Sequence, residues 1–220
     1  VQAKRTAVFP VKNFGSQLAP FYTILPLFVG SLLMAVTLKP GVSRKNREGL
    51  DNPKPHQLFL GHYGVFGVIA LPQSTLSLGG NLLFLHVQAV HPWLFMLAGW
   101  TSSLVFSFFT YTMVASFGNV GKAIGVLVLV TQISGSNGAY PLAVLPKIIS
   151  DISPFLPATH SIVALRAAIA GIYNNDYWHA LGSLLLFLIP LLLIGLVLRI
   201  PLVKFNKWYV AKVESTKVIS

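Results

Sequence analysis

The sequence predicts an all-α, polytopic integral membrane bundle of about five spanning helices, with a proline-broken, re-entrant helix pair before the last span. Three observations predict this class. The 220 residues are 54% hydrophobic, and their mean hydropathy is +0.71. Only 10% of them are charged, which is too few to cover a soluble domain of this size. Apolar segments of about 20 residues, the length that crosses a bilayer, recur along the chain.

The expected transmembrane domain covers residues 18–203. Its predicted spans are residues 18–38, 58–85, 93–116, 120–133 and 180–203. In the second span, Pro72 and the pair Gly79-Gly80 are expected to kink or end the helix. The fourth span is short and has Lys122 near its start, where a long side chain can extend to the interface.

Residues 134–178 form a different kind of segment, because prolines interrupt it and its helical stretches are too short to cross. Its re-entrant part is expected over residues 140–172. Two short helices that enter the membrane and return fit this pattern better than a span. Irregular backbone at that depth must be shielded by protein or line a wet cavity. The candidate residues, with a structural role or a role in a transport path, are Gly135, Gly138, Pro141, Pro146, Asp151, Pro154, Pro157 and Arg166.

Asp151 and Arg166 are two charges within this broken segment. An isolated charge inside a membrane is costly, so pairing is favoured. One hypothesis is that the two side chains pair across the short helices and hold the re-entrant hairpin. The alternative is that both lie in the outer headgroup layer and face water.

Small residues recur at helical spacing on two predicted neighbours. Gly99, Ser103 and Ser107 form one face, and Gly121 and Gly125 form another. Small residues let helices approach closely in membranes. We therefore expect these two helices to pack as a hairpin; a transport path along the same faces is the weaker alternative.

The distribution of Lys and Arg predicts orientation, because positive loops stay in the cytoplasm. With five spans, eleven of the 16 basic residues fall on one side. This places residues 1–17 outside and the tail 204–220 in the cytoplasm, and an odd span count implies a further span upstream. The cytoplasmic loop contains Lys39, Arg44, Lys45 and Arg47. That loop is expected to bind anionic lipid or to dock a partner ATPase.

Other classes of function find little support in the sequence. The five acidic residues lie outside the predicted spans, and the histidine spacings do not match a helical metal site. We therefore expect no catalytic residues, no metal and no cofactor. The net charge of +11 is explained by membrane orientation, so no nucleic-acid partner is expected. The chain contains no cysteine, which excludes disulfides.

Four ordered segments carry a resemblance to a known family. They are Asn13-Phe14-Gly15 with Leu18-Ala19-Pro20-Phe21-Tyr22, then the run 117–123, then the run 132–138 with Tyr140-Pro141, and last Pro154-Phe155-Leu156-Pro157 with the run 164–173. Together they resemble the C-terminal membrane domain of the phage infection protein family, also called YhgE/Pip. Ala167 departs from the pattern, since an acidic residue is expected after the arginine. This departure strengthens Asp151 as the expected partner of Arg166.

The resemblance implies an architecture similar to ABC-2 exporter permeases, with six spans and a re-entrant pair before the last. It also implies an upstream span and a large extracellular domain ahead of this region. The first functional hypothesis is a homodimeric permease of the cell membrane that exports an envelope or amphipathic molecule, with energy from a separate ATPase subunit. The alternative is an anchor for an extracellular domain that acts as a phage receptor or as a type VII secretion accessory.

Overall fold

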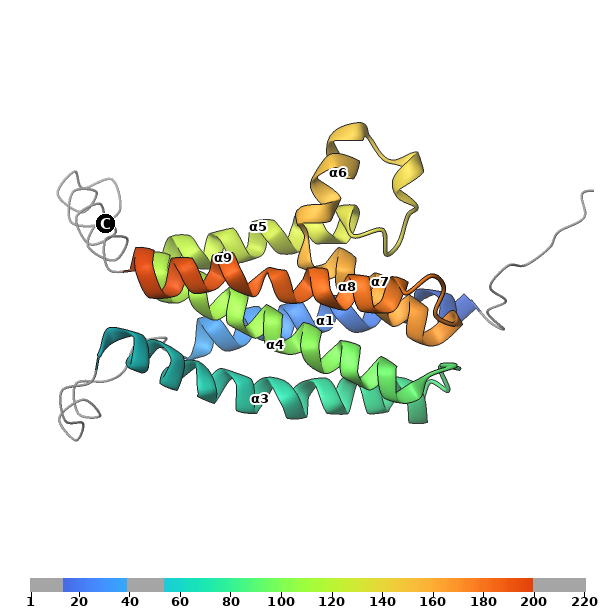
Figure 1. Cartoon of the computed structure of the whole chain (residues 1–220), viewed down its shortest axis with the longest axis horizontal. Helices are drawn as coiled ribbons and strands as arrows, with labels where there is room; N and C mark the ends of the chain where they lie inside the picture. The colour runs from blue at the N-terminus through green and yellow to red at the C-terminus, as the bar shows by residue number, and fades with distance from the viewer. Residues whose placement is uncertain (1–13, 39–53, 200–220) are drawn as a thin grey trace, which may run out of the picture.

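The computed structural model describes residues 14–38 and 54–199, and all regular structure in these ranges is helical (Figure 1). Four long helices are followed by a series of shorter ones. They are α1 (Phe14–Thr37), α3 (Pro55–Leu83), α4 (Pro92–Phe117), α5 (Asn119–Gly135), η1 (Leu142–Val144), α6 (Lys147–Ile152), η2 (Ser153–Phe155), α7 (Pro157–Ala170), α8 (Asp176–Leu186), α9 (Leu188–Leu193) and η3 (Ile194–Leu198). The predicted all-α class is confirmed for the described part of the chain.

Within residues 14–38 and 54–199, three helical segments are long and apolar enough to cross a membrane: α1, α4 and the combined run Asp176–Leu198. A fourth candidate is the pair Lys147–Phe155 and Pro157–Ala170, which is bent by 80° and is either a broken span or a re-entrant loop. The 17 residues of α5 measure about 26 Å at 1.5 Å per residue. The expected number of five spans therefore stays a prediction.

The second predicted span forms one continuous helix. α3 runs over 29 residues through Pro72 and through Gly79 and Gly80, and it ends only at Leu83. Proline removes a single backbone hydrogen bond. Pro72 is exposed on α3, and the helix continues through it. The expectation that these residues end the helix is therefore wrong.

α4 is the central helix of the bundle, with contacts to α1, α3, α5, α7, α8 and α9 (Figure 1). Its aromatic residues belong to two buried clusters. Phe95 and Phe106 lie in one cluster with residues of α1, α7 and α8, and Phe108 and Tyr111 lie in the other with residues of α3 and α9. This packing fixes the positions of α1 and α7, between which the candidate site lies.

Polar side chains join α4 to α3. The Ser103 hydroxyl donates to the Ala70 carbonyl at 3.1 Å, and the Tyr111 hydroxyl donates to the Phe59 carbonyl at 2.8 Å. Such hydrogen bonds contribute about 0.6 kcal/mol each on average between membrane helices. Together with close packing, they hold α3 against the central helix.

The small-residue faces pack only in part against the partners that the sequence suggested. A Cβ at Gly99 would overlap the Leu78 side chain of α3, so this face packs on α3 rather than on α5. Gly121 does approach α4, where its Cβ would overlap the Met113 backbone, but Gly125 lies against Leu32 of α1. The spacing of small residues marks a close helix contact without specifying which helix makes it.

The end of α7 is fixed by the loop between α3 and α4. The backbone N–H groups of Val90 and His91 donate to the Ile169 and Ala168 carbonyls at 3.1 and 2.9 Å. Carbonyls in the last turn of a helix have no partner within the helix, so these bonds satisfy them. Gly171, with a φ of +113°, then turns the chain away from the helix.

Candidate functional site

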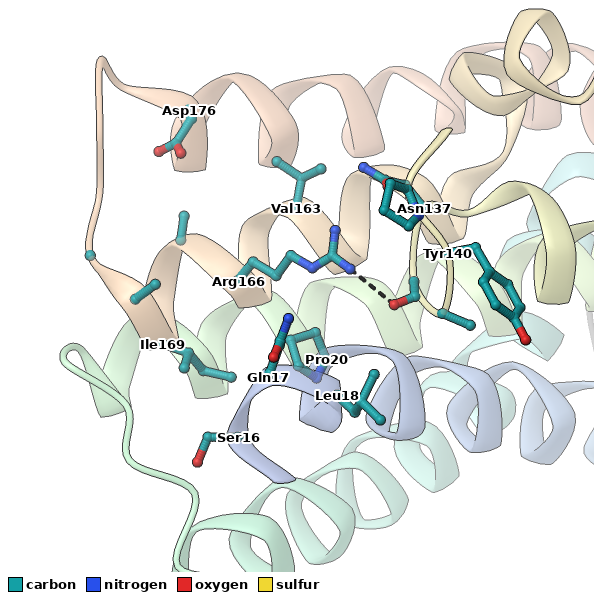
Figure 2. A pocket seen from close by; sticks show the side chains of 16 residues that line it. Ser16, Gln17, Leu18, Pro20, Asn137, Tyr140, Val163, Arg166, Ile169 and Asp176 are labelled. Carbon is teal, nitrogen blue, oxygen red and sulfur yellow. Dashed lines mark hydrogen bonds between the residues drawn. The ribbon is translucent and has the colours of Figure 1, made fainter. Parts of the chain in front are cut away.

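A cavity of about 550 Å³ opens between α1, α7 and the segment after α5 (Figure 2). Its lining residues include the starts of α1 and α8, which lie at one end of the bundle (Figure 1). Three parts of the chain, together with the start of α8, form its walls. The lining residues are Ser16, Gln17, Leu18, Pro20, Asn137, Gly138, Ala139, Tyr140, Pro141, Val163, Arg166, Ala167, Ile169, Ala170, Gly171 and Asp176. We call this cavity the Arg166 pocket.

The segment after α5 leaves the helix through Asn137 and passes close to α1. Asn137 has a φ of +56°, a left-handed conformation that asparagine tolerates better than most residues. Gly138 is buried, and a Cβ at this position would overlap the Phe21 ring of α1. The absence of a side chain at residue 138 therefore lets this segment form one wall of the Arg166 pocket.

Arg166 is half-buried on α7 and directs its guanidinium across the pocket (Figure 2). Its Nη2 donates a hydrogen bond to the Gly138 carbonyl at 3.0 Å. This bond connects the middle of α7 with the segment after α5. Two residues that the sequence analysis singled out, Gly138 and Arg166, thus lie together in one site.

Of the two hypotheses for Asp151 and Arg166, the ion pair is not formed, since Arg166 bonds to the Gly138 carbonyl instead. Asp151 is exposed on α6, which projects sideways from the bundle (Figure 1). Across residues 14–38 and 54–199, no carboxylate lies within the 4.0 Å of a cation that would define an ion pair. The backbone carbonyl of Gly138 takes the place of the expected carboxylate as the partner of Arg166.

Asp176 contributes the carboxylate of the pocket. Its Oδ1 accepts the backbone N–H groups of Tyr173 and Tyr177 at 3.2 and 2.8 Å. These bonds place the carboxylate at the N-terminus of α8, where the helix dipole favours a negative charge. In Figure 2 it lies on the opposite side of the pocket from the Arg166 guanidinium.

Apolar side chains surround these charges. Leu18 and Pro20 of α1 and Val163 and Ile169 of α7 line the pocket. A cavity with apolar walls and few polar groups is the usual form of a small-molecule site, and 550 Å³ lies in the usual range of about 300 to 1,000 Å³. The arrangement suits a ligand that is itself amphipathic.

The opposite end of the bundle carries positive charge. Lys54 precedes α3, Lys122 lies in the first turn of α5, and Arg199 follows η3. The Arg199 guanidinium lies over the Phe59 ring, 5.4 Å from its centroid, in a cation–π contact. The predicted basic loop with Lys39, Arg44, Lys45 and Arg47 lies outside the described residues.

Most residues that line the pocket were not selected from the sequence, and Gln17 and Asp176 are two of them. Gln17 was assigned to the segment before the first span, although α1 begins at Phe14. Asp176 was set aside because it lies outside the predicted spans. Both reach the pocket only because α1, α7 and α8 converge, and no local pattern signals this convergence. The remaining candidates Gly135, Pro146, Pro154 and Pro157 do not line the pocket.

Comparisons with known proteins give a consistent result. A family model described as ABC-2 family transporter protein matches residues 8–197. The Uncharacterized protein YhgE of Bacillus subtilis (strain 168) is 29% identical over 189 residues, which cover 84% of this chain and 23% of that protein. The chain therefore spans less than a quarter of the length of this relative. No solved structure matches the chain.

Proposed function

Because the chain belongs to the ABC-2 family of transporter proteins, we propose that it is the permease part of an exporter that moves an envelope or amphipathic molecule. The similarity to YhgE agrees with the family resemblance of its motifs. The observation that carries the proposal is the Arg166 pocket, whose apolar walls and single guanidinium suit an amphipathic substrate. A substrate needs such a cavity, whereas an anchor can be packed solid.

The proposed topology has five crossings, with residues 55–83 and 119–135 crossing beside the three apolar candidates. α3 and α5 both contact α1 and α4, which supports a shared direction through the bilayer. Of the five Lys and Arg residues in the described ranges, Lys54, Lys122 and Arg199 lie at one end, whereas Lys147 and Arg166 lie elsewhere. This majority supports a cytoplasmic location for that end. The Arg166 pocket would then face the outer side.

The partners remain part of the proposal. Energy for export would come from a separate ATPase subunit, and two copies of the permease would form a homodimer. The basic loop would either dock the ATPase or bind anionic lipid. Pull-down of a nucleotide-binding subunit that is lost when Arg44, Lys45 and Arg47 are neutralised would support docking. A pull-down unchanged by these substitutions would contradict it.

A second candidate function is that of an anchor. It is supported by the length of YhgE, of which the matched region forms only 23%. In this case the helices would hold an extracellular domain that serves as a phage receptor or as a type VII secretion accessory. The integrity of the Arg166 pocket would then have no influence on function.

A substitution that fills the pocket distinguishes the two candidates. Ala170→Trp on α7 places a large side chain in the pocket, whereas Ala123→Trp places the same side chain on an exposed face of α5. Cells that lack the protein are complemented with each variant, and their envelope extracts are compared by mass spectrometry. We expect Ala123→Trp to restore the wild-type profile and Ala170→Trp to fail. Full restoration by a normally expressed Ala170→Trp variant would contradict export through this pocket.

A further inference from the structure

The Arg166 pocket holds a guanidinium whose hydrogen-bonding capacity is mostly unused. Arginine has five N–H donors, and within the described residues one of them has a recorded partner, the Gly138 carbonyl at 3.0 Å. A carbonyl oxygen carries no net charge, so it does not neutralise the cation. The remaining donors form a planar group that matches the oxygens of a phosphate or a carboxylate.

Two side-chain amides line the same pocket as this guanidinium. Gln17 of α1 and Asn137 of the segment after α5 both line the pocket, and in Figure 2 their side chains lie on either side of Arg166. Among residues 14–38 and 54–199, no hydrogen bond to either amide is recorded. Each has two N–H donors that an anionic oxygen accepts.

The carboxylate of Asp176 does not cancel this positive character. It is held by the backbone N–H groups of Tyr173 and Tyr177 on the far side of the pocket, which partly compensate its charge. The charge of Arg166 therefore dominates on the side of the pocket away from Asp176. An anion is favoured on that side of the pocket.

The rest of the pocket accepts hydrocarbon. Val163 and Ile169 line it, and Tyr140 at its edge has 63% of its surface exposed. An anion with no apolar part would leave these walls without a partner. A ligand that combines one anionic group with an apolar chain would contact both parts of the pocket.

From these observations we infer that the Arg166 pocket binds the phosphate or carboxylate headgroup of an anionic amphiphile, with the apolar part against Val163 and Ile169. The inference rests on the proposed permease function, since it names the class of molecule that the same pocket takes. A lipid, rather than a free anion, is the occupant, because the apolar walls form most of the pocket.

Native mass spectrometry of the full-length protein tests the inference. The protein is equilibrated with equal amounts of phosphatidylglycerol, phosphatidylcholine and phosphatidylethanolamine, and the lipid retained after detergent exchange is counted. We expect preferential retention of phosphatidylglycerol. Arg166→Gln should lower this retention about fivefold, because it removes a charge-assisted hydrogen bond. Lys147→Gln removes the same charge from the exposed α6 and should leave retention unchanged.

A second variant separates binding from folding. Ala170→Trp keeps Arg166 and its bond to Gly138 but fills the pocket, so it should also lower retention. Equal retention of the three lipids by the wild type would overturn the inference. So would equal effects of Arg166→Gln and Lys147→Gln, or normal retention by Ala170→Trp. Release of the lipid by excess inorganic phosphate would overturn the assignment to an amphiphile, because a free anion would then suffice.

The lipid-binding experiment and the export experiment can fail separately. If phosphatidylglycerol binding depends on Arg166 while Ala170→Trp restores the envelope, the binding site stands and the export proposal fails. If Ala170→Trp blocks export while the wild type shows no lipid preference, the export proposal stands and the headgroup assignment fails.

Discussion

The Arg166 guanidinium and the Gly138 carbonyl lie 3.0 Å apart and join α7 to the segment that follows α5, 28 residues earlier in the chain. This bond crosses the Arg166 pocket and holds two of its walls at a fixed separation. Gly138 also lies against the Phe21 ring of α1. One glycine therefore brings together the three parts of the chain that form the pocket.

Replacement of Gly138 tests this arrangement. Gly138→Val should destabilise the protein by about 1 to 3 kcal/mol, because its side chain would overlap the buried Phe21 ring. The measurement is the midpoint of thermal unfolding in detergent, followed by the fluorescence of tryptophan. Gly182→Val on α8 is the matched control, since nothing lies within 4 Å of a Cβ there. Equal losses in the two variants would show that the Phe21 contact is unimportant.

Because Gly99 contacts Leu78, a smaller side chain at residue 78 should partly restore the stability that Gly99→Ala loses. Gly99→Ala should lower the unfolding midpoint, because its methyl group would overlap the Leu78 side chain of α3. Leu78→Ala creates space at the same point. The double variant should therefore lose less unfolding free energy than the two single variants together, with a coupling energy of about 1 kcal/mol. Strictly additive losses would mean that Gly99 packs elsewhere.

Removal of the buried Tyr111 hydroxyl should destabilise the protein. It donates to the Phe59 carbonyl at 2.8 Å, and its side chain has 0% of its surface exposed. Tyr111→Phe should reduce the free energy of unfolding by about 0.5 to 1.5 kcal/mol. Tyr22→Phe, at an exposed position on α1, serves as the control and should change little. A loss in the control as large as that in Tyr111→Phe would remove the hydrogen bond as the cause.

The proposed orientation predicts a pattern of chemical labelling. These 220 residues contain no cysteine, so single cysteines can be introduced as reporters. Asn175→Cys, beside the start of α8, should react with a membrane-impermeant maleimide on intact cells. Asn119→Cys, at the turn between α4 and α5, should react only after permeabilisation. The reverse pattern would place the Arg166 pocket in the cytoplasm.

Local sequence features predicted some of this structure well. Apolar runs predicted the positions of α1, α4 and the last helical run to within a few residues, because length and apolarity are properties of the segment itself. The prolines of residues 140–172 predicted the break between the short helices, which are bent by 80°. Pro72 and the pair Gly79-Gly80 were expected to kink or end the second span, but α3 continues through them to Leu83.

Relationships between helices were harder to predict. The small-residue faces were recognised, but Gly99 packs on α3 rather than on α5. Arg166 and Gly138 were both selected, but the sequence left open whether Arg166 pairs with Asp151 or whether both charges face water. The structure directs Asp151 outward on α6 and gives Arg166 a backbone carbonyl.

By itself, the sequence determined that this chain is a bundle of helices for a lipid environment and that its regularity breaks after α5. Both conclusions depend on the composition of continuous segments, that is, on their hydropathy and their prolines. Only the tertiary structure decided that Gln17, Asn137 and Arg166 share one pocket. Residues from different helices meet only if each helix has the right neighbours and the right rotation about its own axis. Both depend on the packing of the whole bundle.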